Sequence, residues 1–441
     1  MDSSDSQQRR SPRTGIYLFL VLVALGVVLA WSHVGRDGPD TSEAVIRSGV
    51  GRDLIQGLTR GRQGLVGSLR WAPLPTLLVL PLLHTPGIRT GTFGLCVTAT
   101  IGAAGICVFL NRWWAQYGMR EEVRVPIAFA LFLTPPMLKP IFEGSSETMF
   151  AFLVIATAAH LIHWWETEEL RSLAYTAVCA ALASLVRYQA VLLPILVIVL
   201  LLGHLIARHK REAYAEGTLI TFLVPSVYAF GLWYAANWLI MGDATFFLRG
   251  LDYYLGSPRW WRFLWEGCEW QACLAPGLLG LLGWSLCRLA GRKLSIWTGV
   301  PVLAACGLLW LQGTTSLEPT PAGPATRELR QTVLPYLNMS HRSDKVITSG
   351  YRGYEIHRHT GEVPMFLHKQ SLYLDQALEE TRGKSLYLLV PAPEGIDRWE
   401  DVNLKYPGIF RNGARGVVFE KAWKYWTLWR VVRLDTQDQV I

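Results

Sequence analysis

Apolar residues in this chain are gathered into long blocks separated by short polar segments, and this pattern limits the possible folds more than any other feature. Of the 441 residues, 51% are hydrophobic and only 17% are charged. A helix needs roughly 17–25 predominantly apolar residues to cross about 30 Å of hydrocarbon. Several blocks reach this length, so the sequence predicts an α-helical polytopic membrane protein.

Tryptophan and charge are distributed as expected for such a protein. Many of the 19 tryptophans flank the apolar blocks, and amphipathic rings settle at the depth of lipid headgroups. The formal net charge is +8, but the basic residues lie largely in short loops between the blocks. Orientation in the membrane explains them better than nucleic-acid binding does. Membrane lipids are therefore expected as partners, and nucleic acid is not.

The beginning of the chain predicts the orientation. Residues 1–14 are polar, and Arg9, Arg10 and Arg13 directly precede an apolar run at 16–31. The run is long, and no small-residue cleavage site follows it, so we expect an uncleaved signal anchor. Its basic flank keeps the N-terminus in the cytoplasm and sends residue 32 onward outside the cell, across the inner (plasma) membrane.

Further crossings are expected near 92–110, 124–140, 147–164, 172–188, 190–207, 218–240, 270–288 and 295–311. The apolar piece within 72–87 is too short to cross comfortably, so it is either a short span or a re-entrant or interfacial helix. If it does not cross, the basic loops near 112–124, 208–211 and 288–293 all fall in the cytoplasm, and otherwise they all fall outside. The positive-inside tendency favours about nine crossings plus juxtamembrane helices.

The composition changes after residue 311, which predicts a division into domains. Residues 1–312 form the expected transmembrane domain with a polar outer loop at 32–71, and 313–326 read as a linker. Residues 327–441 have a soluble α/β pattern and are expected outside the cytoplasm. Strands are predicted at 345–350 and 385–390, a helix at 374–381, and a closing hairpin from 417–420 and 425–432.

The first outer loop contains a cluster of carboxylates, Asp37, Asp40 and Glu43. One interpretation is an ordinary solvated loop. The other is that one carboxylate acts as a general base on an acceptor hydroxyl or amine, or that the cluster binds a divalent cation. No spacing of Cys and His typical of a metal site occurs in the chain.

Charged residues at later span ends are predicted on the same outer face. Glu147 opens one span and is either an acid favoured by the helix dipole or a carboxylate that supports a site. Arg187 ends the next and is either a snorkelling anchor or a ligand for the phosphate of a lipid-linked donor. Arg70, Lys139 and Arg249 are further candidates for that phosphate.

Several of these features together resemble the GT-C class of polytopic glycosyltransferases, which includes protein O-mannosyltransferase and aminoarabinose transferase relatives. The shared order is a signal anchor, an acidic outer loop, a Trp/Pro entry into apolar sequence, many spans and an α/β tail. Four stretches correspond to motifs of that class: Ser42-Glu43-Ala-Val-Ile, Trp71-Ala-Pro73-Leu-Pro75, Glu147-Thr-Met-Phe and Leu185-Val-Arg187-Tyr.

The resemblance implies transfer of a sugar from a polyprenyl-phosphate donor to an acceptor lipid, glycan or protein, with inversion at the anomeric carbon. In that class an Asp-Glu pair stands where Ser42-Glu43 stands here. The catalytic role therefore passes to Asp40 or Glu43, with Asp37 third, or is absent in a degenerate scaffold. A transporter or flippase-like protein is the other alternative, although few ionisable residues lie in mid-span and the apolar blocks form no repeated halves.

Overall fold

The computed structural model describes residues 11–35, 39, 41–67, 72–85, 92–248, 270–290, 299–313, 324–341, 344–349, 352–354, 356, 366–369, 386–393, 402–403, 406 and 408–432. Contacts divide the chain into two compact units. The first comprises residues 1–39 and 65–319, and the second comprises 40–64 and 320–441. The sequence predicted a linker between the two domains at 313–326, which lies near the boundary at 319/320. It assigned residues 40–64 to the transmembrane domain, whereas they belong to the second unit.

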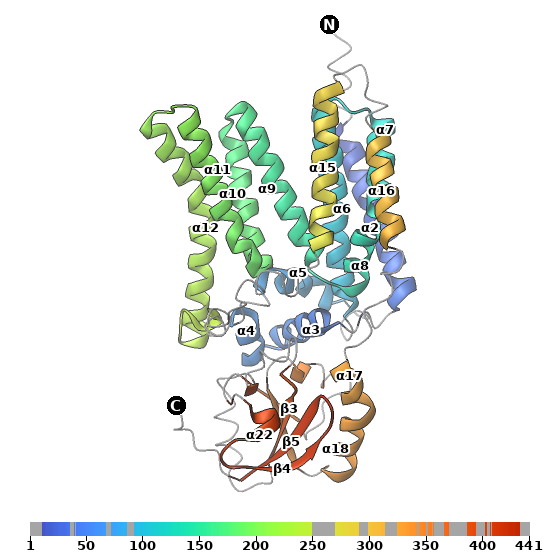
Figure 1. Cartoon of the computed structure of the whole chain (residues 1–441), viewed down its shortest axis with the longest axis vertical. Helices are drawn as coiled ribbons and strands as arrows, with labels where there is room; N and C mark the ends of the chain where they lie inside the picture. The colour runs from blue at the N-terminus through green and yellow to red at the C-terminus, as the bar shows by residue number, and fades with distance from the viewer. Residues whose placement is uncertain are drawn as a thin grey trace. The chain divides into compact units, whose positions relative to one another are not determined.

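The first unit is a bundle of helices (Figure 1). Its elements are α2 (Ser11–Val34), α5 (Pro73–Leu83), α6 (Phe93–Gln116), α7 (Glu121–Phe132), α8 (Pro135–Glu143), α9 (Glu147–Thr167), α10 (Leu170–Val186), η1 (Tyr188–Val191), α11 (Leu192–Ala207), α12 (Glu212–Met241), η2 (Phe246–Leu248), α15 (Trp270–Ala290) and α16 (Gly299–Gly313).

Five helices among the described residues are long and apolar enough to cross a membrane: 14–34, 93–116, 147–167, 188–207 and 212–241. A bent pair formed by α7 and α8 makes a sixth if it is counted as one span. The predicted crossings at 172–188 and 270–288 correspond to shorter apolar helices. These findings support a helical membrane protein.

Burial differs among these helices as expected in lipid. The apolar window of α6 is 72% buried, whereas those of α11 and α12 are 33% and 22% buried. Large side chains such as Ile206, Val227 and Leu239 point outward from α11 and α12. An exposed apolar surface of this extent is unfavourable in water and suits contact with acyl chains.

Prolines are concentrated at the junction of α7 with α8 and in α5. Thr134 precedes Pro135 and adopts an extended conformation, because a residue before proline is disfavoured in the helical region. Helices α7 and α8 meet there at 48°, so the backbone leaves regular helix within the crossing expected at 124–140. Helix α5 has eleven residues. At 1.5 Å per residue it rises about 16 Å, roughly half the hydrocarbon thickness.

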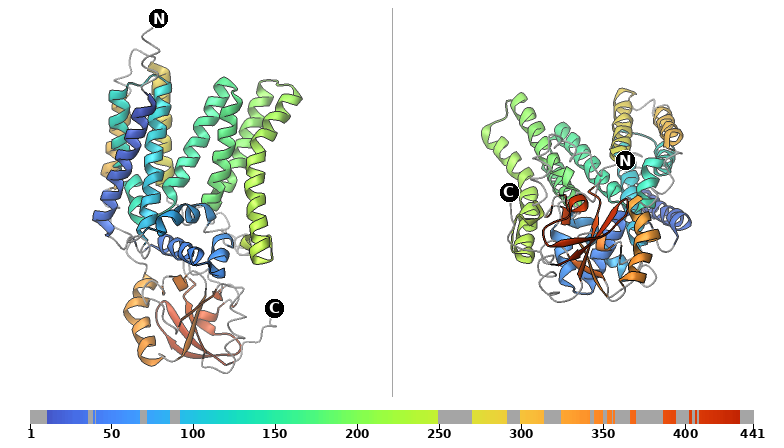
Figure 2. Two further views of the ribbon diagram at one scale, coloured as in Figure 1. Left: turned by 180° about the vertical axis from the view of Figure 1, so that it is seen from behind. Right: turned by 60° about the horizontal axis from the view of Figure 1, so that its bottom comes forward.

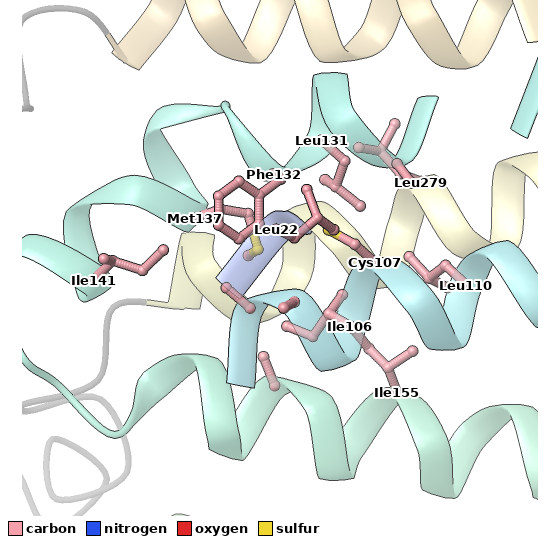
Figure 3. Packing of buried hydrophobic residues seen from close by; sticks show 14 of the residues in the cluster. Leu22, Ile106, Cys107, Leu110, Leu131, Phe132, Met137, Ile141, Ile155 and Leu279 are labelled. Carbon is pink, nitrogen blue, oxygen red and sulfur yellow. The ribbon is translucent and has the colours of Figure 1, made fainter. Parts of the chain in front are cut away.

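The main core of the first unit gathers side chains from α2, α6, α7, α8, α9 and α15 (Figure 3). Leu22, Ile106, Phe132, Met137 and Leu279 are all buried in it. A second cluster joins α9 and α10 to α11 and α12, with Trp164 and Phe222 fully buried. Helix α9 contributes to both clusters and therefore connects the two parts of the bundle.

The second unit contains a five-stranded sheet in the order β2-β1-β3-β5-β4. The strands are β1 (Lys345–Ser349), β2 (Phe366–Lys369), β3 (Leu386–Pro391), β4 (Val417–Ala422) and β5 (Trp426–Val431). Strands β2, β1 and β3 are parallel, and β5 and β4 continue the sheet as an antiparallel hairpin. The predicted strands and hairpin are confirmed, β2 was not predicted, and the predicted helix at 374–381 lies outside the described residues.

Helices cover the sheet. Helix α17 (Pro324–Glu328), a π-helical turn (Leu329–Val333) and α18 (Leu334–Ser340) pack on one face through Leu329, Val333 and Leu337 (Figure 2). The other face packs against Val402 and the short helix α22 (Ile409–Asn412). Strand β3 is buried along its whole length, as expected for a central strand covered on both faces.

The second unit also includes α3 (Ser42–Ile55) and most of α4 (Thr59–Val66). The expectation of a polar loop across 32–71 is therefore wrong for these residues. Glycines suggested a loop, but Thr41 caps α3 by accepting a hydrogen bond from the amide of Ala44. Residues 44–51 are buried, and burial outweighs the low helix propensity of Gly49 and Gly51.

Candidate functional site

A buried ion pair forms where α9 begins and α10 ends. Nη2 of Arg187 lies 3.3 Å from Oε1 of Glu147, and the side chains are 7% and 5% exposed. Nε of Arg187 donates a hydrogen bond of 3.3 Å to Oγ of Ser146. Both charges were singled out from the sequence as separate helix-end residues, and the structure brings them together.

The local backbone explains why the pair forms at this place. Helix α8 ends at Glu143, the following Gly144 adopts the left-handed conformation that favours glycine, and α9 begins at Glu147. Helix α10 ends at Val186, and Arg187 turns to an extended conformation before the 3₁₀ turn η1. Because α9 and α10 are neighbours in one antiparallel pair, the start of one lies beside the end of the other.

Tight packing holds the start of α9 against α6. Oγ1 of Thr148 donates a 2.7 Å hydrogen bond to the carbonyl of Ala99. A Cβ added at Gly102 would lie 2.8 Å from the backbone nitrogen of Met149, so only glycine permits this approach. The carboxylate of Glu147 is therefore carried by a rigid part of the bundle, as functional groups usually are.

Gln189 adds a polar group beside this pair in the sequence. Its side chain is buried, and its amide oxygen has no hydrogen-bond partner among the described residues. Leaving such an acceptor unsatisfied costs about 1–3 kcal/mol. The oxygen therefore retains the capacity to accept a hydrogen bond. Ser146 and Gln189 were not predicted, although both adjoin stretches that the sequence did indicate.

Helix α8 carries two further charges near this end of α9. Lys139 is half-buried, and Glu143, the last residue of the helix, is buried. They are four residues apart and so lie on the same helix face. The ring of Phe142 stacks on His33 of α2, with ring centroids 4.3 Å apart. Lys139 was predicted as a phosphate ligand, and its position in α8 is compatible with that role.

Glu43 lies in the other unit, in the first turn of α3. Its Oε1 accepts a 2.8 Å hydrogen bond from Nε of Arg47, one turn later, and Arg47 is only 1% exposed. This pairing holds the carboxylate in one orientation. The other two predicted acids, Asp37 and Asp40, and the predicted phosphate ligands Arg70 and Arg249 lie outside the described residues.

Helix α3 is fixed to the C-terminal part of its unit by Tyr354. Oη of Tyr354 donates a 3.0 Å hydrogen bond to Oδ2 of Asp53, which is buried. A Cβ at Gly49 would lie 2.3 Å from Cδ1 of the same tyrosine. Gly49 and Asp53 are one helical turn apart, so the ring lies across one face of α3. The segment that carries Glu43 is therefore an integral part of the second unit.

The described residues contain no group of three His, Cys, Asp or Glu side chains arranged to hold a metal ion. This search does not include Asp37 and Asp40, the acids for which the sequence suggested a divalent cation. Comparison with known proteins gave no matching family model and no matching curated protein.

Proposed function

We propose that the chain is a membrane glycosyltransferase that moves a sugar from a polyprenyl-phosphate donor to an acceptor at the outer face of the inner membrane. The observation that carries this proposal is the buried pair of Glu147 and Arg187 at one end of the apolar helices. Removing two charges from water is costly, and ionisable residues within membrane-spanning helices are rare and suggest a functional site.

In this proposal Arg187 binds the phosphate of the donor. Its planar guanidinium offers several donors and suits the oxygens of a phosphate. Glu147 and Ser146 orient it through the contacts described above. The amide oxygen of Gln189 is suited to accept a hydrogen bond from a hydroxyl of the sugar. Lys139, Arg70 and Arg249 are additional cations for the same phosphate.

The acids between residues 37 and 43 activate the acceptor in this proposal. Asp40 or Glu43, with Asp37 as the third choice, takes the proton from an acceptor hydroxyl or amine. The acceptor atom attacks the anomeric carbon, the bond from that carbon to the phosphate oxygen breaks, and the phosphate leaves on the lipid. Arginine, or a divalent cation held by the same acids, neutralises the negative charge that develops on this leaving group. The configuration of the sugar inverts.

The membrane layout that accompanies this function has about nine crossings and an extracytoplasmic C-terminal domain that binds the acceptor. Transport is the competing class of function. The charged residues of the described long apolar helices lie near helix ends, as Glu147, Glu166 and Glu212 do. Ion and proton pathways require such groups at mid-span, so this distribution favours the transferase.

Variants in isolated membranes test the proposal. Membranes with the wild-type chain should transfer label from polyprenyl-phosphate sugars to an acceptor. Glu43→Gln, Asp40→Asn and Arg187→Lys are compared at equal protein levels, with Glu216→Gln, an exposed acid far along the sequence, as the control. We expect one of the two acid variants to lose at least about 100-fold in rate, the scale of general-base catalysis. Arg187→Lys should also lose rate, because lysine cannot make the forked contact with a phosphate. Unchanged transfer in all three variants would refute the assignment.

A further inference from the structure

A cavity of about 530 Å³ lies between α6, α9 and α10, away from the ion pair. It is lined by residues from the end of α6, the end of α9 and the beginning of α10. His163, one of these residues, follows Glu147 by sixteen positions on α9. At 1.5 Å per residue the two lie about 24 Å apart along the helix axis. The cavity is therefore separate from the candidate active site.

The charged groups that line the cavity are mostly cationic. Arg112 comes from α6 and Arg171 from α10, and both are exposed. Glu169 is the carboxylate in the lining, and its Oε2 lies 3.5 Å from Nε2 of His163. Arg112 forms no ion pair with any residue that the structure describes. The lining thus carries an excess of positive charge and attracts anions.

Arg171 is held in place at the side of the cavity. Its Nε donates a 3.0 Å hydrogen bond to Oη of Tyr175, and its guanidinium carbon lies 5.5 Å from the centre of that ring. The ring of His160 lies between Phe109 and Tyr175, with centroids 5.6 Å and 5.1 Å away. Oriented guanidinium groups bind phosphate oxygens in a forked geometry and lose little entropy in doing so.

The position of the cavity along the helices suggests the source of an anion. Trp165 lies at the same end of α9 and is partly exposed, and tryptophan settles at headgroup depth. The turn from Arg208 to Arg211, which joins α11 to α12, is basic and lies at this end of the bundle as well (Figure 1). The volume is within the range of small-molecule sites, roughly 300–1,000 Å³.

We propose that this cavity binds a phosphate group, with Arg112 and Arg171 as its ligands. The phosphate belongs either to the headgroup of an anionic phospholipid or to a soluble phosphate ester. The proposal is independent of the transferase function, because none of these residues belongs to the candidate active site.

Retention of lipid by the purified full-length protein tests this inference. The protein in detergent is titrated with phosphatidylglycerol, phosphatidylcholine or glycerol 3-phosphate, and the bound molecules are counted by native mass spectrometry. The test variant is Arg112→Gln/Arg171→Gln. The control is Arg208→Gln/Arg211→Gln, which removes the same charge from the same end of the bundle outside the cavity. Tyr175→Phe keeps all charges and removes only the hydrogen bond to Arg171.

We expect the test variant to bind phosphatidylglycerol at least about tenfold more weakly than the wild type, while the control is nearly unchanged. Tyr175→Phe should give a smaller loss, which does not depend on how well the double variant folds. If glycerol 3-phosphate binds as strongly as phosphatidylglycerol and the test variant weakens its binding as well, the phosphate belongs to a soluble ester. An equal loss in test and control variants would show diffuse attraction and overturn the proposal. The same holds if neither anionic probe is preferred over phosphatidylcholine, whose choline cation neutralises its phosphate.

Discussion

Glu147 and Arg187 bury opposite charges together, so a change to one of them leaves the other in a place that water reaches poorly. Their individual identities could be read from the sequence, because an acid that opens an apolar span and a base that ends one are both visible there. Their pairing depends on the packing of α9 against α10, which spacing does not reveal. The four-residue separation of Glu43 and Arg47 brings their side chains together only because α3 is a helix, and the sequence predicted a loop there.

Substitution of either member of the buried pair should destabilise the first unit. We expect Glu147→Gln and Arg187→Gln each to cost about 3–5 kcal/mol, because one partner of a buried pair is left without its counter-charge. The double variant should cost less than the sum. Thermal unfolding in detergent, followed by tryptophan fluorescence, measures all three. Additive losses would mean that the two side chains do not interact.

At the scale of elements, helix α3 is the largest departure from the expectation. Its glycines are typical of a loop, and the sequence contains no sign that Tyr354, about 300 positions later, covers Gly49. A contact of such long range cannot be inferred from local pattern. The break between α10 and α11, and the strands β1, β3, β4 and β5, depend on local sequence and were predicted.

Gly49→Ala should loosen α3 within the second unit. The new Cβ would lie 2.3 Å from the ring of Tyr354, so the helix or the ring must move. Gly217→Ala is the matched control, since it also lies inside a helix and has no atom within 4 Å of an added Cβ. In the control, the free energy of unfolding should rise by about 0.5–1 kcal/mol, because alanine loses less backbone entropy on folding than glycine does. Limited proteolysis should cut 40–64 faster in Gly49→Ala only, and equal rates would contradict the assigned contact.

For the whole molecule, the division into an apolar helical part and a small α/β part was predictable from composition. The number of crossings was not, because several predicted spans coincide with helices shorter than the hydrocarbon thickness. The outward-facing apolar side chains of α11 and α12 agree with a membrane environment. The candidate site was predictable in its residue types, whereas its burial and its hydrogen bonds depend on tertiary packing.

The central claim is that a bond between sugar and phosphate is broken. A polyprenyl-phosphate sugar labelled differently in its sugar and in its phosphate, supplied to the purified protein in proteoliposomes with a membrane extract as acceptor, tests it most directly. We predict that the sugar label moves to the acceptor while the phosphate label stays on the lipid. Joint movement of both labels across the bilayer, with the two still attached to each other, would contradict the transferase and identify a transporter.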